Sequence, residues 1–493
     1  MENKKFRVIL IVGICSFLAC GVLWSLHLIL KNGKNEEERE DKYTKLVIAY
    51  STQAAGTKEQ REVEEAVNKI VKEKLHIELE FRVYSQNYAS NINRMLAGQE
   101  QLDLAFSYKS MYENYVMNQQ IYQLDSLLKN YGQGILNTVG QKIIDTCKIN
   151  DKLYGLPNNR DYAVGWDAYI LQKDLLDKYQ IDATTILTEQ ELEQVFDVIK
   201  KGEPGITIVA STGGNMLSNL YFSLESIGVH MKEGQSEKVS NLFETKEYKR
   251  ALKRIRRWFL NGYLDENVLE QTQSVQKRMK EGTLFAYEYR AKPGVEQQES
   301  VACQRKVVCV QLGKNIVANN EPASMQWVIT KNSISPEKSM QLLNLLYTNA
   351  DLMNLLSYGI AGKHYVYTKD GHITYPKGKN SNPFIETAWE MPNQFITYIW
   401  EGNPLSLWTD IRAFNEEAIY GCDFGFNFDT STVATEYITL QEIYNRYSYI
   451  LGNGLVDPEE GLEKMNKEMK SNFIDDVITQ EQRQFDEWKI DSK

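Results

Sequence analysis

Between residues 46 and 108 the sequence alternates short apolar runs with amphipathic helical segments. The runs 46–51 and 103–108 are rich in strand-forming residues, and apolar residues alternate strictly from Ile77 to Val83. Between the first two runs, apolar residues recur at helical spacing after a capping-box pair, Thr57 and Gln60. This order of strand, helix, strand, helix and strand predicts a parallel sheet with right-handed crossovers, and therefore an α/β fold.

Polar side chains follow the predicted strands of this sheet. Thr52 and Gln53 come directly after the first strand, and Ser107 and Tyr108 end the third. In open α/β sheets, ligands bind beyond the carboxyl ends of the strands. We therefore expect these four residues at a ligand-binding edge, although polar residues follow many strands without binding a ligand.

An apolar run from Val8 to Leu30 is interrupted by only two serines and a histidine, and three basic residues precede it. It is long enough to cross a bilayer as a helix, which needs roughly 20 residues. The basic end is expected to stay in the cytoplasm. Residues 1–31 are therefore predicted to anchor the protein in the cell membrane on its extracellular face. The polar, charged segment 32–44 is predicted to be a linker.

Two alternatives remain open for the anchor. A cleaved signal peptide fits less well, because its apolar run usually spans about 7–15 residues. Lipidation of Cys20 is the stronger alternative, since Ala19 and Gly21 suit the positions that flank a lipidated cysteine. Phe17 and Leu18 depart from the usual lipidation pattern, and the ten residues after Cys20 remain apolar.

The exported part of the chain is acidic and poor in cysteine. The whole chain has a net charge of −10 and its first 31 residues carry +3, so the remainder carries −13. Such a surface argues against binding to nucleic acid or anionic lipid. Outside the anchor, Cys147, Cys303, Cys309 and Cys422 do not form a disulfide framework, although a single bridge stays open. Aromatic residues make up 11% of the chain, which suits exposed binding surfaces.

The chain after the linker is too long for a single core and is expected to form two lobes. A segment punctuated by Gly155 and Pro157 looks like a crossing between them. Its pattern predicts residues 45–155 as the first part of lobe 1, 156–320 as lobe 2, 321–375 as the return to lobe 1, and 376–493 as a mostly helical C-terminal region.

Further candidate residues lie at turns and strand ends. Asn158 and Arg160 follow the crossing, and Asn215 ends a Ser-Thr-Gly-Gly-Asn turn before a predicted helix. Tyr289 and Arg290 end a predicted strand. For each of these residues, a structural role in a turn, in the core or in an ion pair is the simpler alternative to ligand binding. A strand in which Met325, Trp327 and Ile329 alternate is expected to return the chain to the first lobe.

No catalytic or metal-binding motif stands out. The sequence contains no Gly-x-Ser-x-Gly, His-Glu-x-x-His or Cys-x-x-Cys motif and no phosphate-binding loop. His364 and His372 lie close together but lack further ligands at metal-binding spacing. We therefore expect a protein that is not an enzyme and that needs no cofactor or metal. A carboxylate pair for glycoside hydrolysis stays open, because such pairs are defined in space.

Several motifs carry a family resemblance. The first part of the chain contains MLAGQEQLDLAF and DKLYGLPNN, and the last part contains YTNADLMNLLSYGIAGKHYVY, MPNQFITYIW, GFNFD, GLVDPEEGLEKMNKEM and ITQEQRQFDEW. Together these segments resemble bacterial extracellular solute-binding proteins, the substrate-capturing subunits of ABC importers. The C-terminal motifs resemble the lipoprotein-type subset with a C-terminal domain of unknown function. The chain departs from this subset at Ala361, where glutamate is usual, and in its lipidation signal.

The resemblance implies a type II periplasmic-binding-protein-like fold, in which two α/β lobes joined by crossing strands close around a ligand. It also implies a small solute, most often a sugar or oligosaccharide, and ABC transporter permease subunits as partners. Under this hypothesis, Trp166, Tyr289 and Trp327 are predicted to stack on the ligand or wall its cleft. The predicted hydrogen-bonding residues are Thr52, Gln53, Ser107, Tyr108, Asn158, Arg160, Asn215 and Arg290. Two alternatives are a ligand sensor for a membrane signalling partner and a surface glycoside hydrolase.

Overall fold

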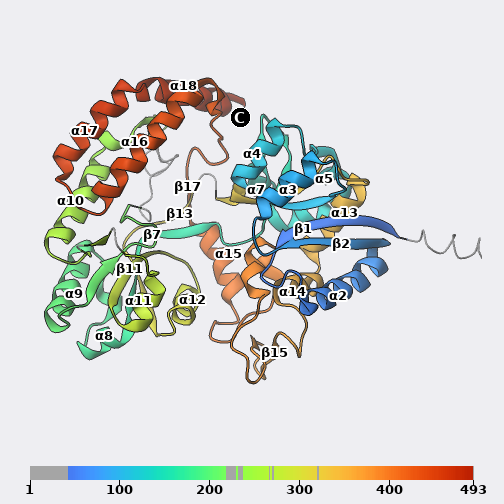
Figure 1. Cartoon of the computed structure of the whole chain (residues 1–493), viewed down its shortest axis with the longest axis horizontal. Helices are drawn as coiled ribbons and strands as arrows, with labels where there is room; N and C mark the ends of the chain where they lie inside the picture. Colours follow the sequence, from blue (N-terminus) through green and yellow to red (C-terminus); the bar gives the residue numbers. More distant parts are fainter. Residues whose placement is uncertain are drawn as a thin grey trace, which may run out of the picture.

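The structure, a computed structural model, describes residues 43–217, 229–230, 237–265, 267–268, 271–318 and 321–491. Within these ranges, no helix combines the length and apolarity that a membrane crossing requires. The predicted anchor with Cys20, and all but the end of the predicted linker, lie outside them. The described chain forms two α/β lobes, and a group of C-terminal helices extends along one of them (Figure 1).

Lobe 1 is built on a five-stranded sheet in the order β2-β1-β3-β14-β6. Its strands are β1 (Thr44–Ser51), β2 (Ile77–Tyr84), β3 (Leu104–Tyr108), β6 (Gly155–Pro157) and β14 (Met325–Ile329). β1 pairs in parallel with β2 and β3, as the sequence alternation predicted. β14 pairs antiparallel with both β3 and β6, so the predicted return of the chain to this lobe is observed.

The helices of lobe 1 cover this sheet and connect its strands. They are α2 (Lys58–Leu75), α3 (Tyr88–Ala97), α4 (Lys109–Met117), α5 (Asp125–Tyr131), α6 (Gln133–Val139), α7 (Gln141–Asp145), α13 (Pro336–Thr348) and α14 (Ala350–Tyr358). A short hairpin, β4 (Lys148–Ile149) and β5 (Lys152–Leu153), precedes β6. The α2 helix begins as predicted, because the N-cap Thr57 side chain accepts a hydrogen bond from the Gln60 amide.

Lobe 2 contains a second sheet in the order β17-β13-β7-β11-β8, with β12 also paired to β7. Its strands are β7 (Ala163–Gln172), β8 (Thr207–Ala210), β11 (Leu284–Ala291), β12 (Val307–Gln311), β13 (Asn315–Val317) and β17 (Ile419–Tyr420). Its helices are α8 (Lys173–Lys178), α9 (Glu189–Gly202), α10 (Lys246–Leu260), α11 (Val275–Glu281) and α12 (Val295–Ala302). The short strands β9 (Val229–His230) and β10 (Ser240–Asn241) pair with each other as an antiparallel ribbon.

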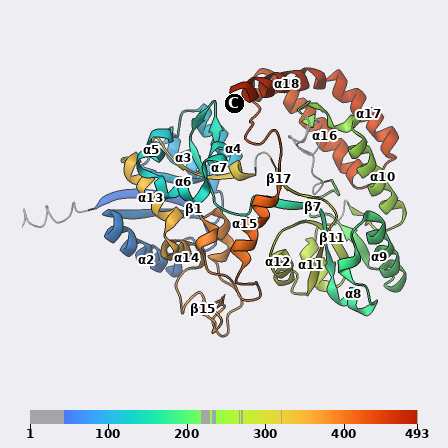
Figure 2. The ribbon, with the colours of Figure 1, turned by 180° about the vertical axis from the view of Figure 1, so that it is seen from behind.

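The segment 376–493, predicted as one region, divides between the two lobes. Its first part packs on lobe 1, where Phe384 and Met391 join the hydrophobic core. It then continues through α15 (Leu407–Glu417) to β17 of lobe 2. The last three helices, α16 (Ala434–Gly452), α17 (Pro458–Ser471) and α18 (Ile474–Asp491), share the core of lobe 2 (Figure 2). In that core, the rings of Phe243 and Tyr444 stack with centroids 5.8 Å apart.

Two sequence features, the cysteines and the turn at Ala361, take a definite place in the fold. Cys147, Cys303, Cys309 and Cys422 are all free thiols in the structure, so no bridge joins them. Ala361 is exposed in a turn that Lys363 ties to α2 through an ion pair with Glu62. The β15 (Val366–Tyr367) and β16 (Ile373–Thr374) hairpin follows that turn. The helix predicted after Asn215 falls on residues outside the described ranges.

Asp103, at the start of β3, connects three parts of lobe 1. One carboxylate oxygen accepts hydrogen bonds from the Val47 amide and the Gln101 side chain, both at 2.8 Å. The other accepts from the Ser333 hydroxyl at 2.7 Å and the Ile334 amide at 2.9 Å. The side chain is fully buried. Because buried donors without partners are costly, this carboxylate holds β1, β3 and the chain after β14 in register.

We expect Asp103→Ala to lower the free energy of unfolding by about 2–4 kcal/mol, because it leaves buried donors without an acceptor. Urea denaturation followed by circular dichroism measures the loss. Asp145→Ala is a matched control in the same lobe, since Asp145 lies at the surface and pairs with Lys148. An Asp103→Ala protein with the wild-type urea midpoint would show that this carboxylate does not hold the lobe together.

Candidate ligand-binding cleft

The chain passes between the lobes at three places. Two of them are the segment from β6 to β7 and the segment from β13 to β14, and the third leads from α15 to β17. Paired crossings of this kind allow one lobe to rotate against the other about a small number of residues. A site that lies between the lobes can therefore open and close.

Two side chains tie these crossings together. The Arg160 guanidinium donates to the Glu321 carboxylate at 2.7 Å and to the Ser324 hydroxyl at 2.9 Å, and so joins the first crossing to the second. The Asn415 side chain, on α15, accepts from the amides of Tyr162 and Ala163 at 3.0 and 2.9 Å. Arg160 was predicted to bind ligand, but these contacts give it a buried structural position at the hinge.

A polar cluster lies where β1 and β3 end. The Glu390 carboxylate accepts hydrogen bonds from the Ser51 amide at 3.1 Å and from the Ser51 hydroxyl, and the Tyr108 hydroxyl lies 3.3 Å away. Glu390 is only 1% exposed. Burial raises its pKa to about 7, against the lowering effect of its hydrogen bonds. Burial and the nearby Glu390 carboxylate together raise the pKa of Tyr108 to about 12.

Trp389 covers this cluster and is 40% exposed. Its ring lies 6.1 Å from the rings of both Phe106 and Tyr108, measured between centroids. Its carbonyl oxygen accepts a hydrogen bond from the Asn158 side chain at 3.0 Å, so the first crossing fixes its backbone. We define the strand-end cluster as Ser51, Tyr108, Trp389 and Glu390. It offers an aromatic face next to hydroxyl groups.

The other candidates of lobe 1 take different positions. Gln53 is exposed beside the cluster, whereas Thr52 and Ser107 are buried and bond to neighbouring groups. Trp327 is 1% exposed, and its indole N–H donates to the Glu390 carbonyl at 2.9 Å. The prediction that Trp327 stacks on ligand is wrong in this structure, because β14 is a central strand and the ring packs in the core of the lobe.

Three candidates of lobe 2 lie together near the end of β11. The Arg290 guanidinium lies over the ring of Trp166, 4.6 Å from its centroid. The neighbouring Tyr289 hydroxyl accepts a hydrogen bond from the Gln298 side chain at 3.1 Å. Tyr289 and Arg290 are partly exposed. These residues provide a second surface with an aromatic ring and a cation, and they remain predicted ligand contacts.

Asn215 lies apart from those three residues. Its side-chain oxygen accepts from the Leu217 amide at 3.0 Å, and its loop packs on the end of α16. There, the Met216 amide donates to the Gly452 carbonyl at 2.8 Å, and the Asn453 side chain donates to the Gly214 carbonyl. The turn 211–215 therefore connects the lobe 2 sheet to the C-terminal helices.

Sequence reasoning missed Trp389 and Glu390. They lie on a short 3-10 helix, Ile385–Glu390, that follows no helical or strand periodicity. Their partners Ser51 and Tyr108 are 339 and 282 residues earlier in the chain. No local spacing signals a contact over such a separation.

A cavity of about 1710 Å³ lies between lobe 1 and the C-terminal part of the chain. Its lobe 1 wall includes parts of α4 and α7 and the turn between β4 and β5. Its other wall is the loop after β17 with parts of α16 and α18. The aromatic residues that line it are Tyr154, Tyr420, Phe424, Phe426, Phe428, Tyr437 and Trp488. None of the predicted contact residues is among its described lining residues.

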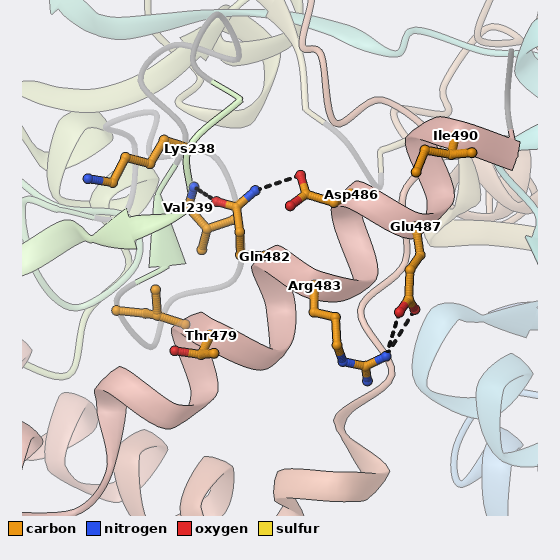
Figure 3. Close-up of a pocket in the computed structure, with 9 residues that line it drawn as sticks. Lys238, Val239, Thr479, Gln482, Arg483, Asp486, Glu487 and Ile490 are labelled. Carbon is orange, nitrogen blue, oxygen red and sulfur yellow. Dashed lines mark hydrogen bonds and ion pairs between the residues drawn. The ribbon is translucent and has the colours of Figure 1, made fainter.

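A smaller cavity of about 520 Å³ lies between Val239 of lobe 2 and α18 (Figure 3). There, the Val239 amide donates to the Gln482 side chain at 2.8 Å. Because all of its walls belong to lobe 2 and the helices attached to it, rotation of the lobes would not close this cavity. The larger cavity is therefore the better candidate for a ligand site.

The buried carboxyl of Glu390 predicts a pH-dependent stability. Its pKa is about 7 in the folded protein and 4.5 for an ordinary glutamate, so the folded state holds an extra proton between these pH values. The free energy of unfolding therefore falls as the pH rises through this window. Glu390→Gln has no proton to lose. Relative to wild type, the free energy of unfolding of this variant is expected to rise by about 2–3 kcal/mol between pH 5 and pH 8.

Denaturant unfolding of both proteins at the two pH values measures this gain. Glu386→Gln is the matched control, because Glu386 is an exposed carboxylate on the same short helix. The difference in unfolding free energy between Glu386→Gln and wild type is expected to be the same at both pH values. If the stability difference between Glu390→Gln and wild type is the same at pH 5 and pH 8, Glu390 does not titrate in this range.

Comparison with known proteins shows what the chain is similar to. Residues 424–490 match a family model described as a domain of unknown function, DUF3502. The chain is 26% identical over 440 residues to a carbohydrate ABC transporter substrate-binding protein of Streptococcus pneumoniae serotype 4, with 86% of this chain and 87% of that protein covered.

Solved structures show the same fold. The N-glycan transport solute-binding protein NgtS of Streptococcus pneumoniae superposes with a TM-score of 0.78 at 24% identity, covering 92% of this chain and 99% of that one. NgtS in complex with Man5GlcNAc gives a TM-score of 0.67 at 22% identity, covering 91% and 99%. The resemblance to bacterial extracellular solute-binding proteins is therefore confirmed, in a two-lobed α/β fold that carries a DUF3502 domain at its C-terminal end.

Proposed function

We propose that this protein captures a sugar or oligosaccharide outside the cell and delivers it to the permease subunits of an ABC importer. The observation that carries this proposal is the strand-end cluster, in which an exposed Trp389 lies beside Tyr108 at the edge where open α/β sheets bind ligands. The similarity to a carbohydrate substrate-binding protein and to NgtS, which binds Man5GlcNAc, supports it.

The chemistry of the cluster suits a carbohydrate. A sugar ring has an apolar C–H face and a rim of hydroxyl groups, so it is complementary to an aromatic plane flanked by hydroxyl groups. Trp389 supplies the plane and Tyr108 the hydroxyl group. Glu390 is buried behind them and acts as a positioning residue, because its carboxylate fixes Ser51 and Tyr108. Tyr289, Arg290 and Trp166 are the proposed contacts from the other lobe.

Closure of the lobes follows from their connections. A ligand that touches both lobes binds the closed arrangement better than the open one, and so shifts the population toward closure. The crossings held by Arg160 and Asn415 are the proposed hinge. The carboxyl group of the strand-end cluster, that of Glu390, is 1% exposed and bonded to Ser51 and Tyr108, so it is not presented to a ligand as a catalytic acid or base. Capture without turnover is the function that this geometry favours.

The location outside the cell rests on the N-terminal sequence. We infer that the apolar run 8–30 holds the protein at the membrane, either as a helix or through a lipid on Cys20. A tether of this kind raises the effective concentration of the loaded protein at its permease. Mass spectrometry of the mature N-terminus distinguishes the two, since a chain that begins at an acylated Cys20 excludes the membrane helix.

A panel of mono- and oligosaccharides tests the function directly. A ligand that binds the native state raises its thermal midpoint, so at least one sugar is expected to raise it in a concentration-dependent manner. Isothermal titration calorimetry then gives the affinity. If no sugar binds while peptides do, or if bound sugar is hydrolysed and releases reducing ends, the proposal fails.

Trp389→Ala is expected to weaken the binding of the best sugar by about tenfold, through the loss of one stacking face. Titration calorimetry measures the change, with circular dichroism to establish that the fold is intact. Tyr131→Ala is the matched control, because Tyr131 is 36% exposed on α5 and lies outside the cluster. Equal affinities of wild type and Trp389→Ala would exclude Trp389 from the sugar site.

A further inference from the structure

We propose that the C-terminal helical region forms a third wall of the binding site and holds the outer sugars of an oligosaccharide in the large cavity. This region is defined as residues 421–491, which include the loop after β17 and helices α16–α18. The inner sugars would lie at the strand-end cluster. The inference rests on the proposed function, since it assumes a carbohydrate ligand.

The size of the cavity is the first argument. Its volume of about 1710 Å³ exceeds the roughly 300–1,000 Å³ that encloses most small-molecule ligands. A monosaccharide or disaccharide would leave much of that space to water. An oligosaccharide that extends from the strand ends would fill more of it.

The chemistry of the lining is the second argument. Aromatic rings such as Tyr154 and Trp488 alternate with side-chain amides such as Asn114 and Asn427. The charged residues carry both signs, and some pair with one another, as Lys148 does with Asp145. A lining of aromatic planes, amides and balanced charge suits a neutral molecule with many hydroxyl groups. It does not select an anion or a cation.

The cavity wall begins close in sequence to the strand-end cluster. Tyr108 belongs to the cluster and is the N-cap residue of α4, and that helix supplies Ser110, from its first turn, and Glu113 to the cavity wall. An extended ligand could therefore pass from the ring of Trp389 along the start of α4. The two places would then be subsites of one cleft.

The opposite wall moves with lobe 2, so hinge closure changes the cavity. Phe426 and Phe485 lie in the core that lobe 2 shares with the C-terminal helical region. Contacts to lobe 1 are made by side chains at the rim. The Lys142 ammonium lies 3.5 Å from the centroid of the Tyr420 ring, and the Asn427 side chain donates to the Lys148 carbonyl at 3.3 Å. Closure of the lobes would bring both walls onto a ligand.

Each wall offers a residue for substitution that is not fully buried. Tyr154, in lobe 1, is half-buried, and Tyr154→Leu keeps apolar packing while it removes the ring face and the hydroxyl group. Arg483, on α18, pairs with Glu487 at 2.8 Å, and its side chain is 51% exposed (Figure 3). Arg446→Ala is the matched control, because Arg446 forms a similar exposed pair with Glu468 between α16 and α17.

The experiment measures affinity against the length of the glycan for the full exported chain. The probes are Man1GlcNAc and Man5GlcNAc, together with homologous di- to hexasaccharides of any other sugar that the panel identifies. We expect wild type to bind a long glycan more tightly than its disaccharide. Tyr154→Leu and Arg483→Ala should each weaken long-glycan binding by about tenfold and disaccharide binding by less than about twofold. The control should behave as wild type.

The possible outcomes separate the two proposals. If the disaccharide binds as tightly as the long glycan, or if both cavity variants bind the long glycan like wild type, the cavity is not a subsite and the inference fails while the proposed function stands. If the variants weaken both lengths equally, they act on the fold or the hinge, and the inference fails as well. If wild type binds none of the sugars, the proposed function fails and the inference with it.

Discussion

The insertion of β14 between β3 and β6 is the constraint on which the rest of the structure depends. Its backbone groups pair with strands on both sides, and a central strand of this kind cannot be left out without exposing two rows of unpaired amides and carbonyls. The chain must therefore leave lobe 1 after β6, build most of lobe 2, and return at residue 325. Two of the three crossings, and with them the cleft between the lobes, follow from this one pairing.

The two ends of the lobe 1 sheet are stabilised unevenly. Asp103 satisfies four donors at the start of β3, far from the cleft, whereas Glu390 is buried at the other end of the sheet with a raised pKa. Burial of a carboxyl group in this way costs stability near neutral pH. In return, the carboxylate fixes the hydroxyl groups of Ser51 and Tyr108 beside Trp389. The end of the sheet with Glu390 is therefore stabilised less than the end with Asp103. This difference is consistent with the idea that strain and buried polar groups concentrate at functional sites.

Much of the fold could be predicted from the sequence, because its signals are local. The alternation from Ile77 to Val83 and the capping pair at Thr57 are patterns within one element, and the structure reproduces them. The site could be predicted only in part. Tyr108 ends a strand and was predicted as a ligand contact, but Glu390 joins that strand end from 282 residues away and was not predicted. The pattern around Trp327 predicts a strand, but it does not indicate whether the ring lies in the core or in a cleft. Only the order of the strands in the sheet decides this.

The location of Phe485 in the lobe 2 core has a consequence for biogenesis. Neither lobe can complete its core from an N-terminal fragment, since lobe 1 requires β14 and lobe 2 requires α18. A chain that crosses the membrane N-terminus first would therefore remain incompletely folded until nearly its last residues emerge. Such a chain depends on folding helpers or rapid export more than a protein built from consecutive domains.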